Sequence, residues 1–153
     1  MMFRVLAVLW LALCGSFVQA LSLQEVLQAN QAAVEKASRK TVDAVLSDLV
    51  TAAAPGTQTF IEKWADRDVW MRKEDKLFFF AETDDKKTYT LLDIETGAPI
   101  SEAQKRDLKQ LKPNSGVRSV LASYLAQFKL MDPEPRRRAQ ALQSIERDPD
   151  ESH

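Results

Sequence analysis

Close pairs of carboxylates are the side chains of this sequence with the most obvious chemical potential. The three pairs are Asp66 and Asp68, Glu74 and Asp75, and Asp84 and Asp85. Two neighbouring carboxylates can act as general acid and base, or can bind calcium. Each pair falls in a predicted turn, however, where solvated aspartates are common. We therefore assign no catalytic, metal-binding or cofactor-binding residue, and a carboxylate-based hydrolase stays as an alternative function.

Histidine and cysteine chemistry is scarce, because the sequence contains one residue of each type. His153 is the last residue, so we expect neither a Ser–His or Cys–His pair nor a histidine metal site. Cys14 lies in a predicted leader, whose removal takes away the thiol and any cysteine metal ligand. These residue types indicate a protein that is not an enzyme.

Basic residues offer one possible anion site, the run Arg136-Arg137-Arg138. Three successive residues of a helix point in different directions, so they do not form one clamp for a phosphate or an acidic lipid. We expect a solvated helix face, with Arg136 pairing to a turn at Asp132. The net charge of -1 and the pI of about 5.9 give no reason to expect a nucleic acid or an anionic membrane surface as partner.

Aromatic residues in the middle of the chain suggest a different kind of site. In a strand from Leu77 to Ala81, Phe78 and Phe80 lie on one face and Phe79 on the other. A small sheet gives one face to its helices, so the other face is either covered by helices and tryptophan side chains or left bare as an apolar patch for a partner. The candidate partner-binding residues are Trp70, Phe78, Phe79 and Phe80.

The first twenty residues are typical of a signal peptide. Arg4 supplies a positive charge, Val5 to Leu13 form a short apolar run, and Val18-Gln19-Ala20 resembles a cleavage site. A mature chain beginning at Leu21 would be secreted to the periplasm. A membrane anchor is the alternative, but the apolar run is too short to span about 30 Å of hydrocarbon. Lipid attachment at Cys14 is a further alternative, which Leu13 disfavours because a small residue is required there.

Periodic apolar residues and turn signals predict the elements that position these side chains. The predicted helices begin at a capping box, Ser22 to Glu25, and continue along the chain at Val42 to Val50, Phe60 to Trp64, Ser101 to Leu111, Val117 to Leu130 and Arg136 to Ile145. The predicted strands are Val69 to Arg72, Leu77 to Ala81 and Tyr89 to Leu92, with turns between them and at Thr96-Gly97. Because its apolar face is the longest, the helix from Val117 to Leu130 is the expected centre of the core.

The order of these elements predicts one α+β domain over residues 21–147, with a frayed tail at 148–153. The fold is expected to be mainly helical, with a small antiparallel β-meander inserted between helical hairpins. Asp132-Pro133-Glu134-Pro135-Arg136, followed by the small residues Ala139 and Ala141, resembles the start of a HEAT-type repeat. We therefore describe the expected hairpins as HEAT-like.

Several motifs together resemble one known family. They are Val69 to Asp75, Asp93 to Pro99, Asp107 to Lys109, Asn114 to Arg118 and Met131 to Arg136. In this order they resemble the extracytoplasmic N-terminal extension of the urea ABC-transporter permease, in the branched-chain amino-acid permease class. The resemblance covers roughly residues 40–147, and its motifs are structural. This chain departs from the family at Asn114-Ser115, where two adjacent asparagines are usual, and no stretch after Leu21 approaches a membrane span.

The resemblance implies a non-enzymatic periplasmic docking module associated with urea transport and unable to conduct solute by itself. Its implied partner is a protein, either a transporter component or the solute-binding protein. An autonomous periplasmic adaptor unrelated to transport is the main alternative, beside the hydrolase named above.

Overall fold

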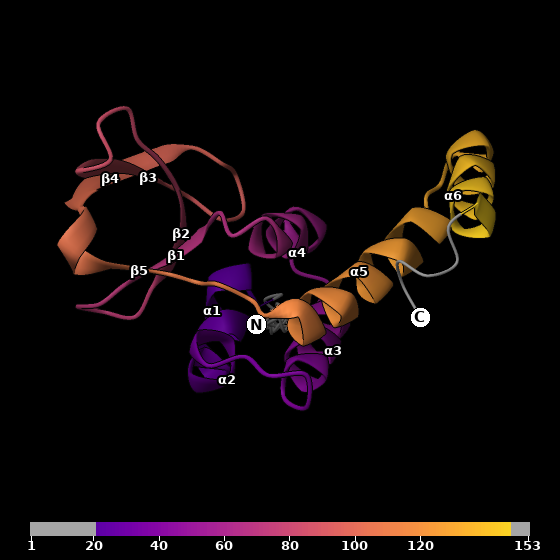
Figure 1. The fold of residues 1–153 in the computed structure, drawn as a ribbon, viewed down its shortest axis with the longest axis horizontal. Helices are drawn as coiled ribbons and strands as arrows, with labels where there is room; N and C mark the ends of the chain where they lie inside the picture. Colours follow the sequence, from indigo (N-terminus) through magenta and orange to yellow (C-terminus); the bar gives the residue numbers. More distant parts are fainter. Residues whose placement is uncertain (1–20, 148–153) are drawn as a thin grey trace, which may run out of the picture.

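The computed structural model describes residues 21–147, in which helices flank a strongly curved antiparallel sheet (Figure 1). The predicted signal peptide and the frayed tail lie outside the described residues. Four helices come before the sheet and two after it: α1 (Leu23–Ala29), α2 (Gln31–Glu35), α3 (Val42–Ala52), α4 (Thr57–Ala65), α5 (Ser115–Leu130) and α6 (Pro135–Arg147). The sheet is formed by β1 (Val69–Arg72), β2 (Phe78–Glu82), β3 (Thr88–Leu92), β4 (Pro99–Gln104) and β5 (Leu108–Gln110). The predicted α+β class is confirmed.

The first helix begins at the predicted capping box. The Ser22 hydroxyl accepts a hydrogen bond from the Glu25 N–H, and the Ser22 N–H donates to the Glu25 carboxylate at 2.7 Å. This helix ends at Ala29 and α2 begins at Gln31, because the helical ladder breaks at Asn30. The Asn30 amide donates to the Val26 carbonyl and to the Asp48 carboxylate, both at 3.1 Å. A side chain that bonds the backbone in this way competes with the helical ladder.

The sheet has the strand order β4-β3-β2-β1-β5, and every neighbouring pair is antiparallel. Its two edge strands, β4 and β5, are joined by a single 3-10 turn, Lys105–Asp107. Three residues span at most about 10 Å. The sheet must therefore curl until its two edges approach each other, as the ring of strands in Figure 1 shows.

The predicted helix from Ser101 to Leu111 is wrong. This segment forms most of β4, the 3-10 turn and β5, with β4 pairing along the whole of β3. Its glutamate, alanine, glutamine and lysine residues favour helix by intrinsic propensity. Pairing with the neighbouring strand overrides that preference, and the polar side chains are tolerated because β4 is a largely exposed edge.

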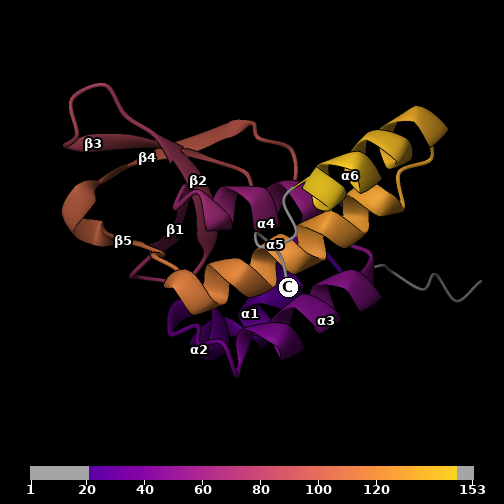
Figure 2. The same ribbon diagram turned by 45° about the vertical axis from the view of Figure 1, so that its right-hand side comes forward.

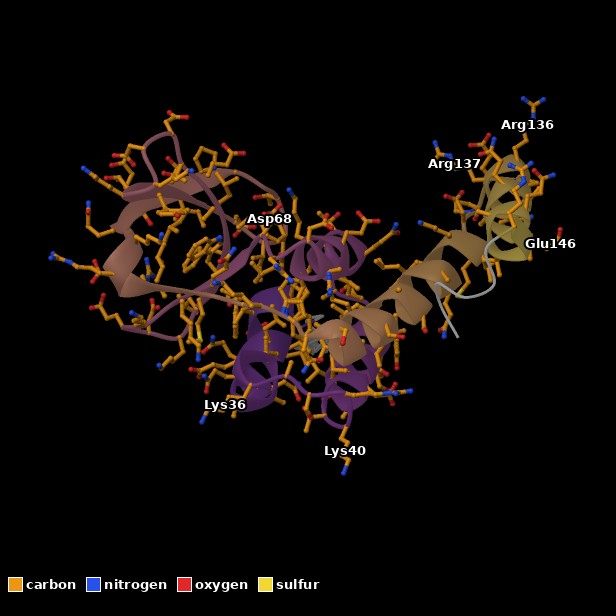
Figure 3. All side chains as sticks on the ribbon, in the orientation of Figure 1. Lys36, Lys40, Asp68, Arg136, Arg137 and Glu146 are labelled. Atoms are coloured by element: carbon orange, nitrogen blue, oxygen red, sulfur yellow. The ribbon has the colours of Figure 1, made fainter. Side chains whose placement is uncertain are left out.

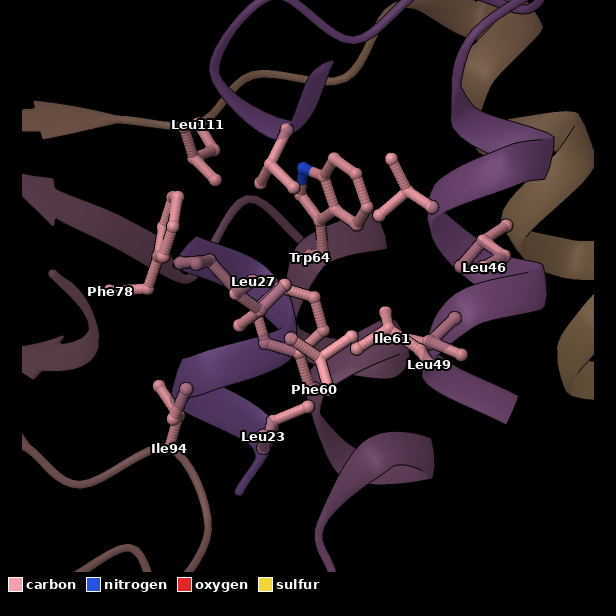
Figure 4. Close-up of a cluster of buried hydrophobic side chains, with 14 of the residues drawn as sticks. Leu23, Leu27, Leu46, Leu49, Phe60, Ile61, Trp64, Phe78, Ile94 and Leu111 are labelled. Atoms are coloured by element: carbon pink, nitrogen blue, oxygen red, sulfur yellow. The ribbon is translucent and has the colours of Figure 1, made fainter. Parts of the chain in front are cut away.

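Two separate clusters of buried side chains lie on the two faces of the sheet. The larger cluster fills the space between the helices and the outer face of β1 and β2, and Figure 4 shows Leu23, Phe60, Trp64 and Phe78 meeting there. The smaller cluster lies inside the curl and consists of Trp70, Phe79, Tyr89, Leu91 and Leu108. One face of the sheet therefore packs against the helices, and the side chains of the other face pack against one another inside the curl.

The helix α5 is not the centre of the core, which corrects the expectation from its apolar face. Val117 and Leu121 are fully buried, but Tyr124, Leu125 and Phe128 are only partly buried. The second half of α5 extends past the other helices, and α6 lies beside it (Figures 1 and 2). The largest fully buried side chains come mostly from α1, α3 and α4.

Candidate functional site at the end of the curled sheet

The four predicted partner-binding residues are all buried, at exposures of 0% for Phe78, 4% for Phe79, 6% for Phe80 and 8% for Trp70. Phe78 and Phe80 face the helices, and Phe79 lies in the cluster inside the curl, so the predicted alternation is confirmed. Of the two alternatives for the second face, the covered one is observed, and the bare apolar patch is not present among residues 21–147. Because the sheet curls, side chains from its own strands cover the face that an open meander would leave bare.

The ring of Phe79 is also closed off by an ion pair. The Arg72 guanidinium lies 4.8 Å from the centre of the Phe79 ring. Two of its nitrogens donate to the Asp75 carboxylate, with Nη2 to Oδ2 at 2.6 Å. The hydrogen bond from Arg72 lowers the pKa of Asp75, and the same bond raises the pKa of Arg72. Phe79 is therefore a covered side chain that needs no partner.

A hollow of about 460 Å³ opens beside the inner cluster, at the end of the curl. Its lining comes from β1, β3, the 3-10 turn, β5 and the second residue after β5: Trp70, Tyr89, Lys105, Leu108, Gln110 and Lys112. The rings of Trp70 and Tyr89 form one wall, with their centres 4.8 Å apart and their planes tilted by 49°. Strand pairing holds Trp70 opposite Gln110, so β1 and β5 fix two of the lining residues relative to each other.

Residues that line the hollow carry hydrogen-bond donors that are not used within residues 21–147. Trp70 and Tyr89 are more than nine-tenths buried, yet neither the indole N–H nor the phenol hydroxyl bonds another of residues 21–147. Both atoms keep some contact with solvent. Within residues 21–147, the side-chain atom that has neither solvent contact nor a hydrogen-bond partner is Ser101 Oγ. The exposed ammonium groups of Lys105 and Lys112 also have no partner within residues 21–147. The site therefore combines an aromatic wall with free donors.

Sequence reasoning found only Trp70 among the residues that line this hollow. It missed Tyr89, although this residue was placed on a strand, and it missed the residues of β5 because Ser101 to Leu111 was assigned as a helix. The sequence does contain a signal for β4, namely the turn residues Thr96-Gly97. In the structure Gly97 has the positive φ, +71°, that such a turn requires. A hairpin turn directly after one strand indicates a second strand to follow, which would have placed β4 correctly.

One member of each of two acidic pairs, Asp75 and Asp85, caps a turn. The Asp75 carboxylate accepts from the Leu77 N–H at 3.2 Å, and the Asp85 carboxylate accepts from the N–H groups of Lys87 and Thr88 at 2.8 and 2.9 Å. These backbone hydrogen bonds lower the pKa of Asp85. Asp68, labelled in Figure 3, lies 3.5 Å from the Lys63 ammonium. Within residues 21–147 no group of three or more His, Cys, Asp or Glu side chains is placed to hold a metal ion.

The three arginines of α6 do not form an anion clamp. Arg136 and Arg137 extend from the far end of the molecule in Figure 3. Arg137 lies 3.7 Å from the Asp132 carboxylate, and Arg138 donates to the Asp132 carbonyl at 2.7 Å. The expected pairing of Arg136 with this turn is therefore wrong, because the helix geometry gives that role to the next two residues.

Comparisons with known proteins returned no match to a family model, to a curated protein or to a solved structure. The resemblance to the urea permease extension stays a prediction from the sequence. Among residues 21–147, none of the helices has both the length and the apolar character needed to cross a membrane.

Proposed function

We propose that this chain is a non-enzymatic periplasmic docking module that binds a component of a urea-type ABC transporter, or its solute-binding protein, through the hollow lined by Trp70 and Tyr89. The observation that carries the proposal is the set of free donors beside a nearly buried aromatic pair. Aromatic residues are enriched at the centres of protein interfaces, where they supply much of the binding energy.

A docking role is supported by how firmly the hollow is built. Trp70 lies on a strand that is paired on both sides, by β2 and by β5. Tyr89 lies on β3, which is paired by β2 and β4. Side chains on such strands lose little conformational freedom when a partner binds, so the entropic cost of association is small.

A carboxylate-based hydrolase is the weaker proposal. A general acid needs a raised pKa near the working pH. The pKa values of Asp75, Asp85 and Asp93 are instead lowered, and backbone N–H groups bond each of these carboxylates. Such groups are ionised acceptors that hold turns together, and they are poorly suited to proton transfer.

We also propose that α5 and α6 form a HEAT-like hairpin. Its support is the turn between the helices, where the Asp132 carboxylate accepts from the Glu134 N–H at 2.8 Å and Arg138 bonds the carbonyls of Asp132 and Pro133. Leu142 on α6 is 53% exposed and Met131 is 80% exposed. A neighbouring repeat would cover such side chains.

The proposal is tested by titrating the purified protein with the urea-binding protein, and with the reconstituted transporter, from the same organism. We expect a dissociation constant of about 10 µM or tighter by calorimetry, in the range of a modest specific interface. Lys112→Glu should weaken binding by about tenfold or more, because it reverses a charge at the hollow without touching the core. Lys40→Glu is the matched control, since Lys40 is an exposed lysine on the helical side of the molecule (Figure 3).

Two results would contradict the proposal. One is the absence of binding to every transporter component, which would favour an autonomous adaptor. The other is equal weakening by Lys112→Glu and Lys40→Glu, which would show that the hollow is not the interface.

A further inference from the structure

The edge of β5 that borders the hollow has backbone groups that do not bond β1. The Leu111 N–H donates to the Val69 carbonyl, and the Lys73 N–H donates to the Asp107 carbonyl, both at 2.9 Å. Bonded and non-bonded residues alternate along an antiparallel pair, so Leu108 and Gln110 turn their backbone groups away from β1. The Leu108 N–H bonds the Lys105 carbonyl. The Leu108 carbonyl and both backbone groups of Gln110 therefore point away from β1, toward the edge of the sheet.

The same edge carries an excess of positive charge. Lys105 precedes β5 in the sequence and Lys112 follows it, and both residues line the hollow. Arg106 lies 3.8 Å from Asp107, and Lys109 is paired with Glu35 at 2.7 Å, so the local negative charges are already matched. The two remaining ammonium groups have no carboxylate partner among residues 21–147. An anionic ligand would supply the missing negative partner for these two ammonium groups.

We infer that the hollow binds an extended acidic segment of the partner protein, in which carboxylates flank an apolar residue. The backbone of the segment adds to the edge of β5 at Leu108 and Gln110, as strand addition does in other recognition domains. The apolar side chain enters the hollow against Trp70 and Leu108, and the carboxylates meet Lys105 and Lys112. This inference rests on the proposed function and specifies the chemistry of the partner.

Each part of such a segment is complementary to a feature of the hollow. The alternation of side chains along a strand places the apolar residue and its neighbours on opposite faces, so carboxylates two positions away return to the same face as the apolar residue. The free indole N–H of Trp70 and the hydroxyl of Tyr89 offer further donors to a carboxylate or a carbonyl. A charge-assisted hydrogen bond to a carboxylate is about twice as strong as a neutral one.

The test uses three probes on the purified protein. They are an acetylated and amidated pentapeptide, Glu-Val-Leu-Val-Glu, the same peptide with glutamine in place of glutamate, and inorganic phosphate. Binding is followed by the NMR signals of the Trp70 indole N–H, assigned with Trp70→Phe, and of the Gln110 amide. The Trp64 indole, buried in the helical core, is the internal control.

We expect the acidic peptide to shift the Trp70 and Gln110 signals, and the glutamine peptide to bind about tenfold more weakly or worse. The double variant Lys105→Gln and Lys112→Gln should bind the acidic peptide more weakly by a similar factor. The double variant Lys36→Gln and Lys40→Gln makes the same change in net charge on the helical side and should bind normally. This control separates a local effect from the overall charge.

Equal binding of the acidic and glutamine peptides would overturn the inference. So would a Trp70 shift that phosphate alone saturates, since that would indicate a simple anion site without strand addition. If a transporter component binds in a way that Lys112→Glu weakens while the peptides fail, only the acidic-segment chemistry is wrong. If the peptides bind but no transporter component does, the proposed function is wrong and the chemistry of the hollow stands.

Discussion

The ammonium group of Lys109 on β5 donates a hydrogen bond to the Glu35 carboxylate on α2 at 2.7 Å, which joins the last strand to the N-terminal helices. Glu35 is mostly covered, with 17% of its side chain exposed, and Lys109 is more open at 41%. The hydrogen bond from Lys109 is the main cause that lowers the pKa of Glu35. The contact ties the curled sheet to the helices beside the larger core.

This contact predicts a pH dependence of stability. A carboxyl group whose pKa is lowered on folding stabilises the fold above its unfolded pKa, and the contribution disappears as the pH falls through the folded value. Glu35→Gln should therefore be less stable than the wild type by about 0.2 to 1 kcal/mol at pH 7, the range for partly exposed pairs. The difference should shrink as the pH falls below the ordinary value of 4.5. Urea denaturation at pH 7 and pH 3 measures it, and a constant difference would contradict the assignment.

The turn before α4 depends on a glycine. Gly56 has a φ of +81°, and a Cβ placed on it would lie 3.1 Å from the Glu95 Cα and 3.1 Å from the Ile94 carbonyl oxygen. Gly56→Ala should cost about 2 kcal/mol or more, from left-handed strain plus this clash with backbone. Gly97→Ala is the control, because Gly97 has a φ of +71° and a Cβ placed on it would have nothing within 4 Å. It should cost about 1 kcal/mol, and equal losses by thermal denaturation would show that the clash relaxes freely.

Burial rather than helix length should decide the effect of mutations in α5 and α6. Leu121 is fully buried, so Leu121→Ala should cost about 2 to 5 kcal/mol. Arg137 pairs with Asp132 and Glu134 but its side chain is 68% exposed, so Arg137→Ala should cost less than about 0.5 kcal/mol. Urea denaturation of both variants gives the comparison. Similar losses would mean that α5 packs differently from the description above.

The inner cluster should behave as a core. Phe79 is 4% exposed and lies in the inner cluster with Trp70, so Phe79→Ala should destabilise the fold by about 3 to 5 kcal/mol. Near-ultraviolet circular dichroism and urea denaturation would report the loss. A variant that keeps its stability but fails to bind the transporter component would instead restore Phe79 as a contact residue.

The leader prediction is tested by mass. Val18-Gln19-Ala20 predicts that the exported protein begins at Leu21. Intact-mass measurement of the protein from the periplasm should match residues 21–153. A mass that includes diacylglycerol on Cys14 would show lipidation instead, and a full-length mass would show that the leader is retained.

Local signals were sufficient for much of the fold. The capping box at Ser22, the break around Gly56 and the strands β1, β2 and β3 were predicted at nearly their observed positions, because each depends on neighbouring residues. The alternation of Phe78 and Phe79 between two faces follows from strand geometry alone. The acidic residues were also recognised as turn residues, and Asp75 and Asp85 act as such.

The tertiary structure decided what each face of the sheet contacts. Whether Phe79 is bare or buried depends on the curling of the sheet. The sheet curls because β5 pairs with β1, which is distant in the sequence, while three residues connect β5 to β4 at the opposite edge. The pairing of β4 with β3 overrides helical propensity, and the pairing of β5 with β1 makes β5 an edge strand and places Gln110 beside Trp70 at the hollow. Contacts between distant residues determine these features, so the chemistry of the candidate site appears only after the chain has folded.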